Sequence, residues 1–453
     1  MPRKKPHNPL RVILPLALLF AGGALALTFM LSPGPAKPGP DDKKTETARA
    51  EEPGGRDAPA PDQPVSSEQP GTDQAGTDQP GTDQAGGDQP GGDEPAAEPD
   101  APIELVGLRA QVVPDPAGDA DWWDRYEPLG GIDPAGDDNL QIAFSRYGAG
   151  VASVQLADYF DASTSPDHVE LQREYDYQNA GVTPFSADRV LINGSEVLLQ
   201  GVPDDGGIEQ RLWEQLPITD PAERSFRATI VNADAEPVLE ITRTYRLEPG
   251  AYEFTIAQRL VNLTDRPLEI AYRQYGPVEL PQITVYPSDR RRLRIGTIRA
   301  SDVGRGIVQG DTALKMHDSA LKPKIKGSSP TRYEPFAEIW PTERAIEQEQ
   351  ILSWIAHTNR YFAVAVLPAS TGSPALEGAA TVERFVLNRE NVSGGLGAVL
   401  GLRLTSGEIT LAPGGSRSLD LAVFAGPKNE SLIADQPLAS AVNLSEVVVY
   451  NFV

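Results

Sequence analysis

Apolar and polar residues alternate in several short stretches beyond residue 104, and turn-forming residues separate these stretches. Leu140–Phe144 alternates and leads into the turn Gly148–Gly150, after which apolar positions resume at Val151. A period of two is typical of strands that bury one face, and glycine permits the left-handed backbone of a tight turn. This pattern predicts a β-hairpin.

The longest alternating stretch contains two turns. Val238–Tyr245 is followed by the turn Glu248–Gly250 and then by Tyr252–Val261, and a second turn at Asn262–Pro267 leads to Leu268–Tyr272. Thr, Val, Ile, Tyr and Phe at every second position suit a pleated surface with one buried face. We expect three consecutive strands that pair as an antiparallel meander.

Shorter apolar runs predict further strands. They are Arg292–Ile298, Trp354–Ala356, Tyr361–Leu367, Thr381–Leu387, Val399–Leu404 and Ser418–Phe424. One window, Glu343–Ile351, has a helical period. Residues 104–438 are therefore predicted to be mostly β, and they exceed the ~100 residues of a simple sandwich. A large double-sheet sandwich is the economical interpretation.

An uncharged run of twenty residues, 12–31, precedes this region. At a rise of about 1.5 Å per residue, it matches the ~30 Å hydrocarbon core of a bilayer. We expect a membrane anchor whose apolar side chains face the hydrocarbon of the bilayer. They are Val12, Leu16, Leu19, Phe20, Leu25, Leu27, Phe29 and Leu31. Residues 1–11 carry the basic charges and so are predicted to be cytoplasmic, with the rest of the chain outside. The alternative is a signal peptide cleaved near Ala24–Ala26, but the apolar run exceeds the usual ~7–15 residues.

Residues 32–103 are rich in Pro, Gly, Asp, Gln and Glu, and Gln69–Asp93 consists of five tandem pentamers such as QPGTD. Such a segment buries too little apolar surface to offset the entropy of ordering it. We expect a disordered acidic tether.

The charge and the absence of cysteine exclude several functions. The chain has no Cys and a formal net charge of -24. Disulfide frameworks, thiolate metal sites and cysteine nucleophiles are therefore excluded. Nucleic acid is an unsuitable partner, because its phosphates bind clustered Lys and Arg.

Candidate catalytic chemistry is sparse. His7, His168, His317 and His357 are scattered, and no metal-binding histidine motif, nucleophile elbow or phosphate-binding loop is present. The fold could bring two carboxylates together, but the sequence does not select a pair. The Trp residues, Trp122–Trp123, Trp213, Trp340 and Trp354, are expected to pack in the core rather than to form sugar platforms.

A basic run, Asp289–Arg294, contrasts with the acidic surroundings. Arg290, Arg291, Arg292 and Arg294 are candidates for contact with anionic lipid head groups. The alternative, which surface charge patterns favour, is a solvated loop and strand edge balanced by nearby acids.

Several segments together resemble the periplasmic domain of the bacterial YidC membrane protein insertases. They are Ser145–Gly150, Leu156–Tyr159, Ile241–Tyr252, Leu260–Leu263, Ser353–Phe362, Leu367–Pro368 and Leu421–Lys428. Their order, after an N-terminal anchor and a low-complexity linker, is similar to that of the family. The resemblance implies a β-supersandwich similar to sugar mutarotases.

The resemblance also implies chaperoning and insertion of inner-membrane proteins without an enzymatic step or a cofactor. The implied partners are the inner membrane, Sec translocon subunits and nascent membrane proteins. Family members continue into further transmembrane helices, so the resemblance implies that residues 439–453 begin the connection to a missing membrane insertase domain. We expect a truncated insertase, with a free-standing anchored domain as the alternative. A carbohydrate-binding or mutarotase-like protein would need a His such as His317 or His357 close to a Glu. A purely structural envelope protein is a third hypothesis.

Overall fold

The computed structural model describes residues 105–114, 126–161, 166–177, 180–201, 210–281, 291–315, 336–387 and 399–448. These residues belong to one compact unit, which extends from Pro95 to Val453. The predicted basic tail, membrane anchor and linker lie outside the described residues, as do Arg290, His317 and Trp122–Trp123. No described helix is long and apolar enough to cross a bilayer.

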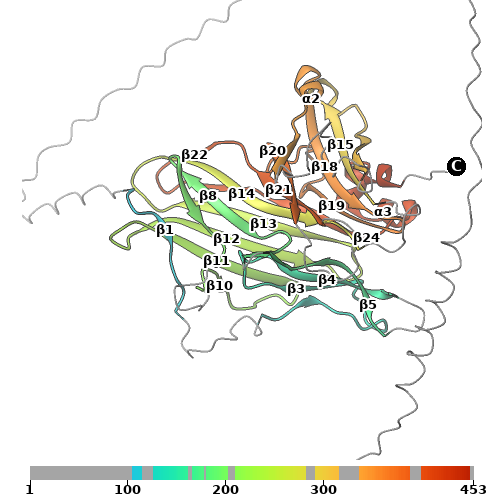
Figure 1. Ribbon diagram of the computed structural model, residues 1–453, viewed down its shortest axis with the longest axis horizontal. Helices are drawn as coiled ribbons and strands as arrows, with labels where there is room; N and C mark the ends of the chain where they lie inside the picture. Colours follow the sequence, from blue (N-terminus) through green and yellow to red (C-terminus); the bar gives the residue numbers. More distant parts are fainter. Residues whose placement is uncertain are drawn as a thin grey trace, which may run out of the picture. The chain divides into compact units, whose positions relative to one another are not determined.

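The described chain forms two large antiparallel sheets (Figure 1). The first has eleven strands within the described residues. Its main path is β1 (Arg109–Ala110), β11 (Glu223–Val231), β12 (Pro237–Leu247), β13 (Glu253–Asn262), β24 (Leu421–Pro427), β19 (Phe362–Pro368), β18 (Gln350–Thr358), β15 (Arg292–Arg299) and β16 (Gln309–Lys315). Two short strands join it from the side, β10 (Glu214–Gln215) on β11 and β23 (Ser416–Ser418) on β13.

The second sheet has seven strands in the same part of the chain. Its path is β17 (Phe336–Trp340), β20 (Thr381–Leu387), β21 (Val399–Thr405), β14 (Leu268–Val278), β8 (Ala187–Ile192) and β9 (Ser195–Leu198), with β22 (Ile409–Leu411) on β14. A smaller sheet contains β2 (Leu129–Gly130), β3 (Leu140–Phe144), β4 (Val151–Phe160) and β5 (His168–Arg173), and β6 (Tyr175–Tyr177) pairs with β7 (Ala180–Val182). The prediction of a mostly antiparallel β-sandwich is confirmed.

The first predicted hairpin is present. β3 and β4 pair as expected, and the Ser145 N–H donates to the Gly150 carbonyl across the turn. Gly148 has a φ of 58°, and a Cβ there would lie 2.3 Å from the Ala187 carbonyl oxygen. Glycine is therefore required both for the backbone conformation and for the close approach of β8.

The predicted meander is correct for two strands and wrong for the third. β12 and β13 pair along their length, but β14 leaves them and pairs with β8, β21 and β22 in the second sheet. The buried Asn262 side chain fixes this crossing, because its Nδ2 donates to the carbonyls of Arg266, Leu411 and Ala412. Alternation of residue types does not distinguish a hairpin turn from a crossing between sheets.

The predicted helix 343–351 is shorter than expected. α2 covers Glu343–Glu347, and Thr342 caps it by accepting a hydrogen bond from the Ala345 N–H at 3.1 Å. Glu349 has a φ of 49°, which ends the helix, and β18 begins at Gln350. Figure 1 shows α2 at the outer end of β15 and β18.

The central strands of the first sheet are buried on both faces, as their continuous apolar sequences require. Every residue of β19 and β24 is buried. One face contacts β14 of the second sheet, and the other is covered by helices. These are α3 (Glu430–Ala434), α4 (Pro437–Ala441) and η5 (Leu444–Val447), whereas η3 (Ala300–Asp302) follows β15.

The C-terminal helices belong to the same core. Leu444 and Val447 are buried, and the Trp354 Nε1 donates to the Val442 carbonyl at 3.1 Å. Trp213, Trp340 and Trp354 are all buried, which confirms their predicted packing role. Residues 439–448, which the sequence assigns to a connection, therefore pack on the sandwich.

Candidate functional site

The structure separates the basic run onto two faces of the first sheet. Arg292 and Arg294 pair with Thr358 and Ala356 across β18, whereas Leu293 pairs with His357. Successive strand residues point to opposite faces, so the two arginines share the face that the C-terminal helices cover. β15 lies between β16 and β18, and Arg294 is only 5% exposed. The prediction of a solvated strand edge is therefore wrong.

Lys428 joins these two arginines from a distant part of the sequence. The row of paired residues Arg292, Thr358, Ala363 and Gly426 crosses four strands, and Lys428 follows Gly426 by two positions on the same face. We call Arg292, Arg294 and Lys428 the basic cluster. Burial, with Arg292 and Arg294, lowers the pKa of Lys428 to about 8.

The basic cluster lacks close carboxylates. Burial is the main cause that lowers the pKa of Arg294, while the exposed Glu446 and Asp311 act on it from longer range. No ion pair within 4.0 Å involves these three cations among the described residues. The Arg294 Nε has no hydrogen-bond partner in the described part of the chain.

The opposite face of the first sheet carries an ion pair and a neutral histidine. Arg291 forms an ion pair with the buried Glu279, whose other oxygen accepts a hydrogen bond from the Leu400 N–H at 2.9 Å. His357 is 1% exposed, and neither ring nitrogen has a partner within the described ranges. Burial, assisted by Arg291, lowers the pKa of His357 to about 3. The imidazole is therefore neutral at physiological pH.

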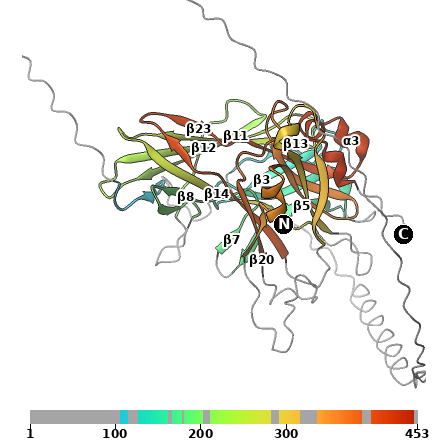
Figure 2. The same ribbon diagram turned by 90° about the horizontal axis from the view of Figure 1, so that it is seen from above.

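A pocket of about 780 Å³ opens at the end of β4 and β5. Its described lining residues are Tyr159, Phe160, Asp161, Val169, Leu171, Pro281, Asn359, Tyr361, Phe362 and Pro427. We call it the aromatic pocket. Figures 1 and 2 place β5 and α3 at this same end of the molecule.

Hydrogen bonds of Asn359 hold one wall of the aromatic pocket in place. Its Oδ1 accepts from the N–H groups of Tyr361 and Phe362, and its Nδ2 donates to the Pro281 carbonyl. Tyr159 packs edge-on against Phe362, with ring centroids 5.6 Å apart. The wall is thus fixed, while the Tyr361 ring remains 48% exposed.

The described histidines do not meet an available carboxylate. Both oxygens of Glu279 are engaged, and His357 is not among the residues that line the aromatic pocket. His168 Nδ1 lies 3.0 Å from the Leu156 carbonyl oxygen, and its ring packs on Phe160. The described residues also contain no group of three potential metal ligands.

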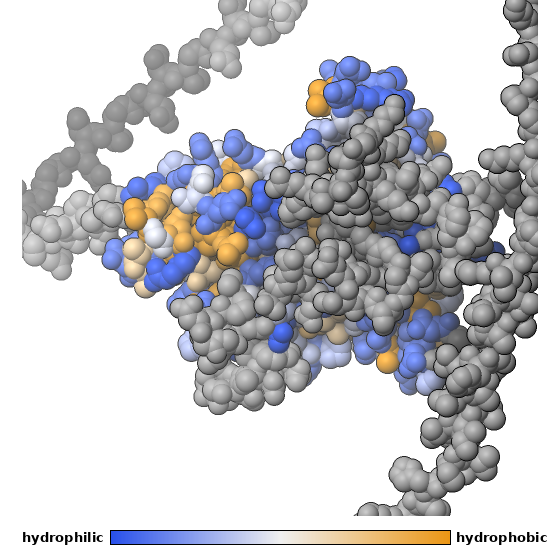
Figure 3. Space-filling model, in the orientation of Figure 1, coloured by the Kyte–Doolittle hydropathy of each residue, from blue (hydrophilic) through white to orange (hydrophobic). Residues whose placement is uncertain are grey.

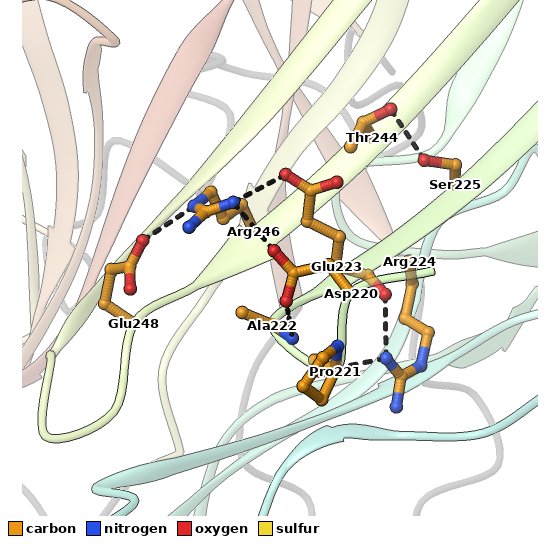
Figure 4. Close-up of polar contacts among 9 residues, drawn as sticks. All are labelled: Asp220, Pro221, Ala222, Glu223, Arg224, Ser225, Thr244, Arg246 and Glu248. Atoms are coloured by element: carbon orange, nitrogen blue, oxygen red, sulfur yellow. Dashed lines mark hydrogen bonds and ion pairs between the residues drawn. The ribbon is translucent and has the colours of Figure 1, made fainter. Parts of the chain in front are cut away.

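Arg246 illustrates the opposite electrostatic arrangement to that of the basic cluster. Figure 4 shows its guanidinium among the carboxylates of Asp220, Glu223 and Glu248, with N···O distances of 3.2, 2.7 and 2.6 Å. Side-chain hydrogen bonds from Glu223 and Glu248 raise its pKa. This network connects the ends of β11 and β12, and the three carboxylates balance the positive charge of Arg246.

Exposed apolar residues do not by themselves single out the aromatic pocket. On the face seen in Figure 3, apolar residues gather at the end where Figure 1 shows β8 and β22. Leu198 on β9 is 46% exposed, close to the value for Tyr361. The distinguishing property of the pocket is its concavity with four aromatic rings.

The YidC periplasmic domain family model matches residues 332–453. The match relates the chain to the YidC family. Within the described residues, it covers the strands from β17 to β24 and the C-terminal helices. No curated protein matches the chain.

Solved structures of several mutarotase-like proteins are similar to this chain. A galactose mutarotase-like protein from Lactobacillus casei has 10% identity and a TM-score of 0.36, covering 66% of this chain and 99% of its own. A GalM/aldose epimerase homologue from C. elegans has 11% identity and a TM-score of 0.34, covering 66% and 99%. A galactose mutarotase related enzyme from Lactobacillus acidophilus has 11% identity and a TM-score of 0.32, covering 66% and 96%.

Proposed function

We propose that the chain assists the insertion and folding of inner-membrane proteins, and that it does so by binding rather than by catalysis. The observation that carries this proposal is the match of the YidC periplasmic domain to residues 332–453. The matched segment includes the buried strands β18, β19 and β24, which form the centre of the first sheet.

The proposed location is the outer side of the inner membrane. The uncharged residues 12–31 would form the anchor, and the basic residues before them favour a cytoplasmic N-terminus. The acidic residues 32–103 would act as a spacer between this anchor and the sandwich.

The aromatic pocket is the proposed contact for apolar segments of nascent membrane proteins, with Sec translocon subunits as further partners. Its volume of about 780 Å³ accommodates several side chains, and Phe160 and Tyr361 present exposed rings. Burial of apolar surface gives about 25 cal/mol per Å², which suits transient binding of unfolded apolar chain.

A binding role without catalysis is supported by the state of the polar groups. Glu279 is held by Arg291 and by a backbone N–H, so it is poorly placed to transfer protons. His357 is buried away from solvent. General acid–base catalysis requires such groups within hydrogen-bond reach of a substrate.

Site-specific photo-crosslinking in cells that make the full chain tests the proposal. A photoreactive amino acid at Tyr361 is expected to capture newly synthesised membrane proteins or Sec subunits. The matched control is the same substitution at Leu198, which is similarly exposed on β9. Equal capture at both positions, or none at Tyr361, would contradict the proposal.

Carbohydrate binding is a second candidate, favoured by the ring-lined pocket with Asp161 at its rim. Aromatic rings and carboxylates suit the apolar faces and hydroxyls of sugars. Titration with a panel of mono- and oligosaccharides would then give saturable binding that Tyr361→Ala weakens and Leu198→Ala does not. A polarimetric assay of sugar anomers with His357→Gln would separate binding from mutarotation.

A further inference from the structure

We propose that Arg292, Arg294 and Lys428 form a binding site for a phosphate-type oxyanion beside the C-terminal helices. This site is distinct from the aromatic pocket. It does not depend on the proposed function, because the argument uses only the sheet register, burial and charge of these three residues.

The sheet register brings the three cations together on one face. Arg292 and Arg294 are two positions apart on β15, and Lys428 lies beyond the end of β24 in the same row of the sheet. The Lys428 N–H donates to the Tyr361 carbonyl at 2.7 Å, which fixes the backbone at this point. The small residues Ala363 and Gly426 separate the cations in this row, and a Cβ added at Gly426 would lie 2.8 Å from the Tyr252 Cδ1, so the Tyr252 ring packs on this glycine.

The surroundings of Gly310 give a second observation, separate from the sheet register, that places the Arg294 side chain. A Cβ added at Gly310 would lie 3.1 Å from the Arg294 Nη2 and 2.6 Å from the Glu446 Cβ. The guanidinium therefore lies between β16 and η5, where it is almost fully removed from solvent. Arg292 and Lys428 are half-buried, which leaves an approach from solvent.

No carboxylate matches the charge of this group among the described residues, in contrast to two half-buried arginines elsewhere in the molecule. Arg403 pairs with Glu383 at 2.6 Å, and Arg189 pairs with Asp188 at 3.0 Å. The basic cluster has no ion pair of this kind among the described residues, and the Arg294 Nε is without a partner there. An unpaired buried cation costs free energy, and a bound anion would offset this cost.

Phosphate chemistry suits the donor set. The guanidinium fork matches the geometry of phosphate oxygens, and an ammonium group adds a point charge. Three cations, partly offset by the exposed Glu446 and Asp311, favour a dianion over a single carboxylate. A free phosphate ion and a lipid phosphate head group share this chemistry.

Thermal unfolding of the full chain in uncharged micelles, with and without inorganic phosphate, tests the site. Lys428→Gln removes one cation at a half-buried position and so is expected to fold normally. Without phosphate it should unfold at the same temperature as the unsubstituted chain or at a higher one. Phosphate should then raise the unfolding temperature of the unsubstituted chain above that of Lys428→Gln, because bound ligand stabilises the folded state.

Phosphate affinity measured by calorimetry gives the second readout. Arg292→Gln and Lys428→Gln should each weaken affinity about tenfold or more, because each removes a charge-assisted contact. Arg299→Gln, an exposed arginine on the same strand, is the matched control and should bind as before. Absence of saturable phosphate binding, or equal loss in all three variants, would overturn the proposal.

Vesicles distinguish the two sources of phosphate. If the ligand is a lipid head group, the protein should bind phosphatidylcholine vesicles that contain phosphatidylglycerol through the basic cluster. Lys428→Gln should then reduce vesicle binding more than Arg299→Gln does. If the ligand is a free ion, inorganic phosphate should bind and the Lys428→Gln difference on vesicles should vanish. Both results support the oxyanion site, whereas failure in both arms overturns it.

Discussion

Charged residues in and around β15 occur in two different arrangements. Glu279 and Arg291 neutralise each other within the protein, so a buried charge remains stable as long as both partners are present. Arg294 is buried without such a partner, and burial, together with Arg292 and Arg294, lowers the pKa of Lys428. The first arrangement serves stability, and the second favours a ligand from outside.

Removal of Arg291 should strongly destabilise the fold. Arg291→Met leaves the buried Glu279 carboxylate without its cation, and the free energy of unfolding should fall by ~3–5 kcal/mol in urea titrations. Arg299→Met, at an exposed position, should change it little. The double variant Arg291→Met/Glu279→Gln should recover part of the loss, and a single variant as stable as the parent would contradict the ion pair.

His357 should make stability depend on pH under acidic conditions. Its pKa is about 3 in the folded protein against 6.5 for the free side chain, so the unfolded chain binds more protons between these values. The contribution of His357 is full above about pH 6.5 and decreases as the pH falls toward 3, by ~1.4 kcal/mol per unit. His357→Gln should flatten this part of the stability profile, which urea titrations at a series of pH values would measure.

At the scale of elements, the sequence predicts strands better than it predicts their neighbours. β20 begins and ends at Thr381 and Leu387 as the apolar run indicates, and β3 likewise agrees with its pattern. The assignment of β14 to the second sheet is not encoded in alternation, because it depends on contacts made by Asn262 with residues near 411.

The same reasoning explains which part of the basic cluster the sequence could predict. Arg292 and Arg294 are recognisable as alternating positions of one strand. Lys428 is more than a hundred residues away, and only the pairing of β15, β18, β19 and β24 brings it to the same face. Arg291 belongs to the sequence run but lies on the opposite face, a distinction that requires the strand register.

The crossing from β13 to β14 should be sensitive to Asn262. Asn262→Ala removes the Nδ2 contacts to three carbonyls and the oxygen that accepts from the buried Thr264 N–H, so the free energy of unfolding should fall by ~2–4 kcal/mol. Asn139→Ala, which removes one exposed bond to the Gly250 carbonyl, should cost much less. Equal losses in a chemical denaturation experiment would contradict this role.

At the scale of the whole molecule, the C-terminal helices complete the sandwich rather than extend from it. η5 places Leu444 in the core, and α4 contacts β19. Leu444→Ala should therefore lower the free energy of unfolding by ~2–5 kcal/mol through the cavity it creates. Ile346→Ala, at an exposed position on α2, is the control. A local loss of helix signal before the main unfolding transition would contradict this integration.

The position of β24 has a consequence for how the molecule is made. In the described part of the first sheet, β24 lies between β13 and β19, and its residues 421–427 join the strands β1–β13 to the strands β15–β19. During synthesis, both halves emerge long before the strand that joins them. Until then, each half keeps a long unpaired margin that can bind another chain. A chaperone that binds the emerging chain would protect these margins for the interval in which the sheet is still divided.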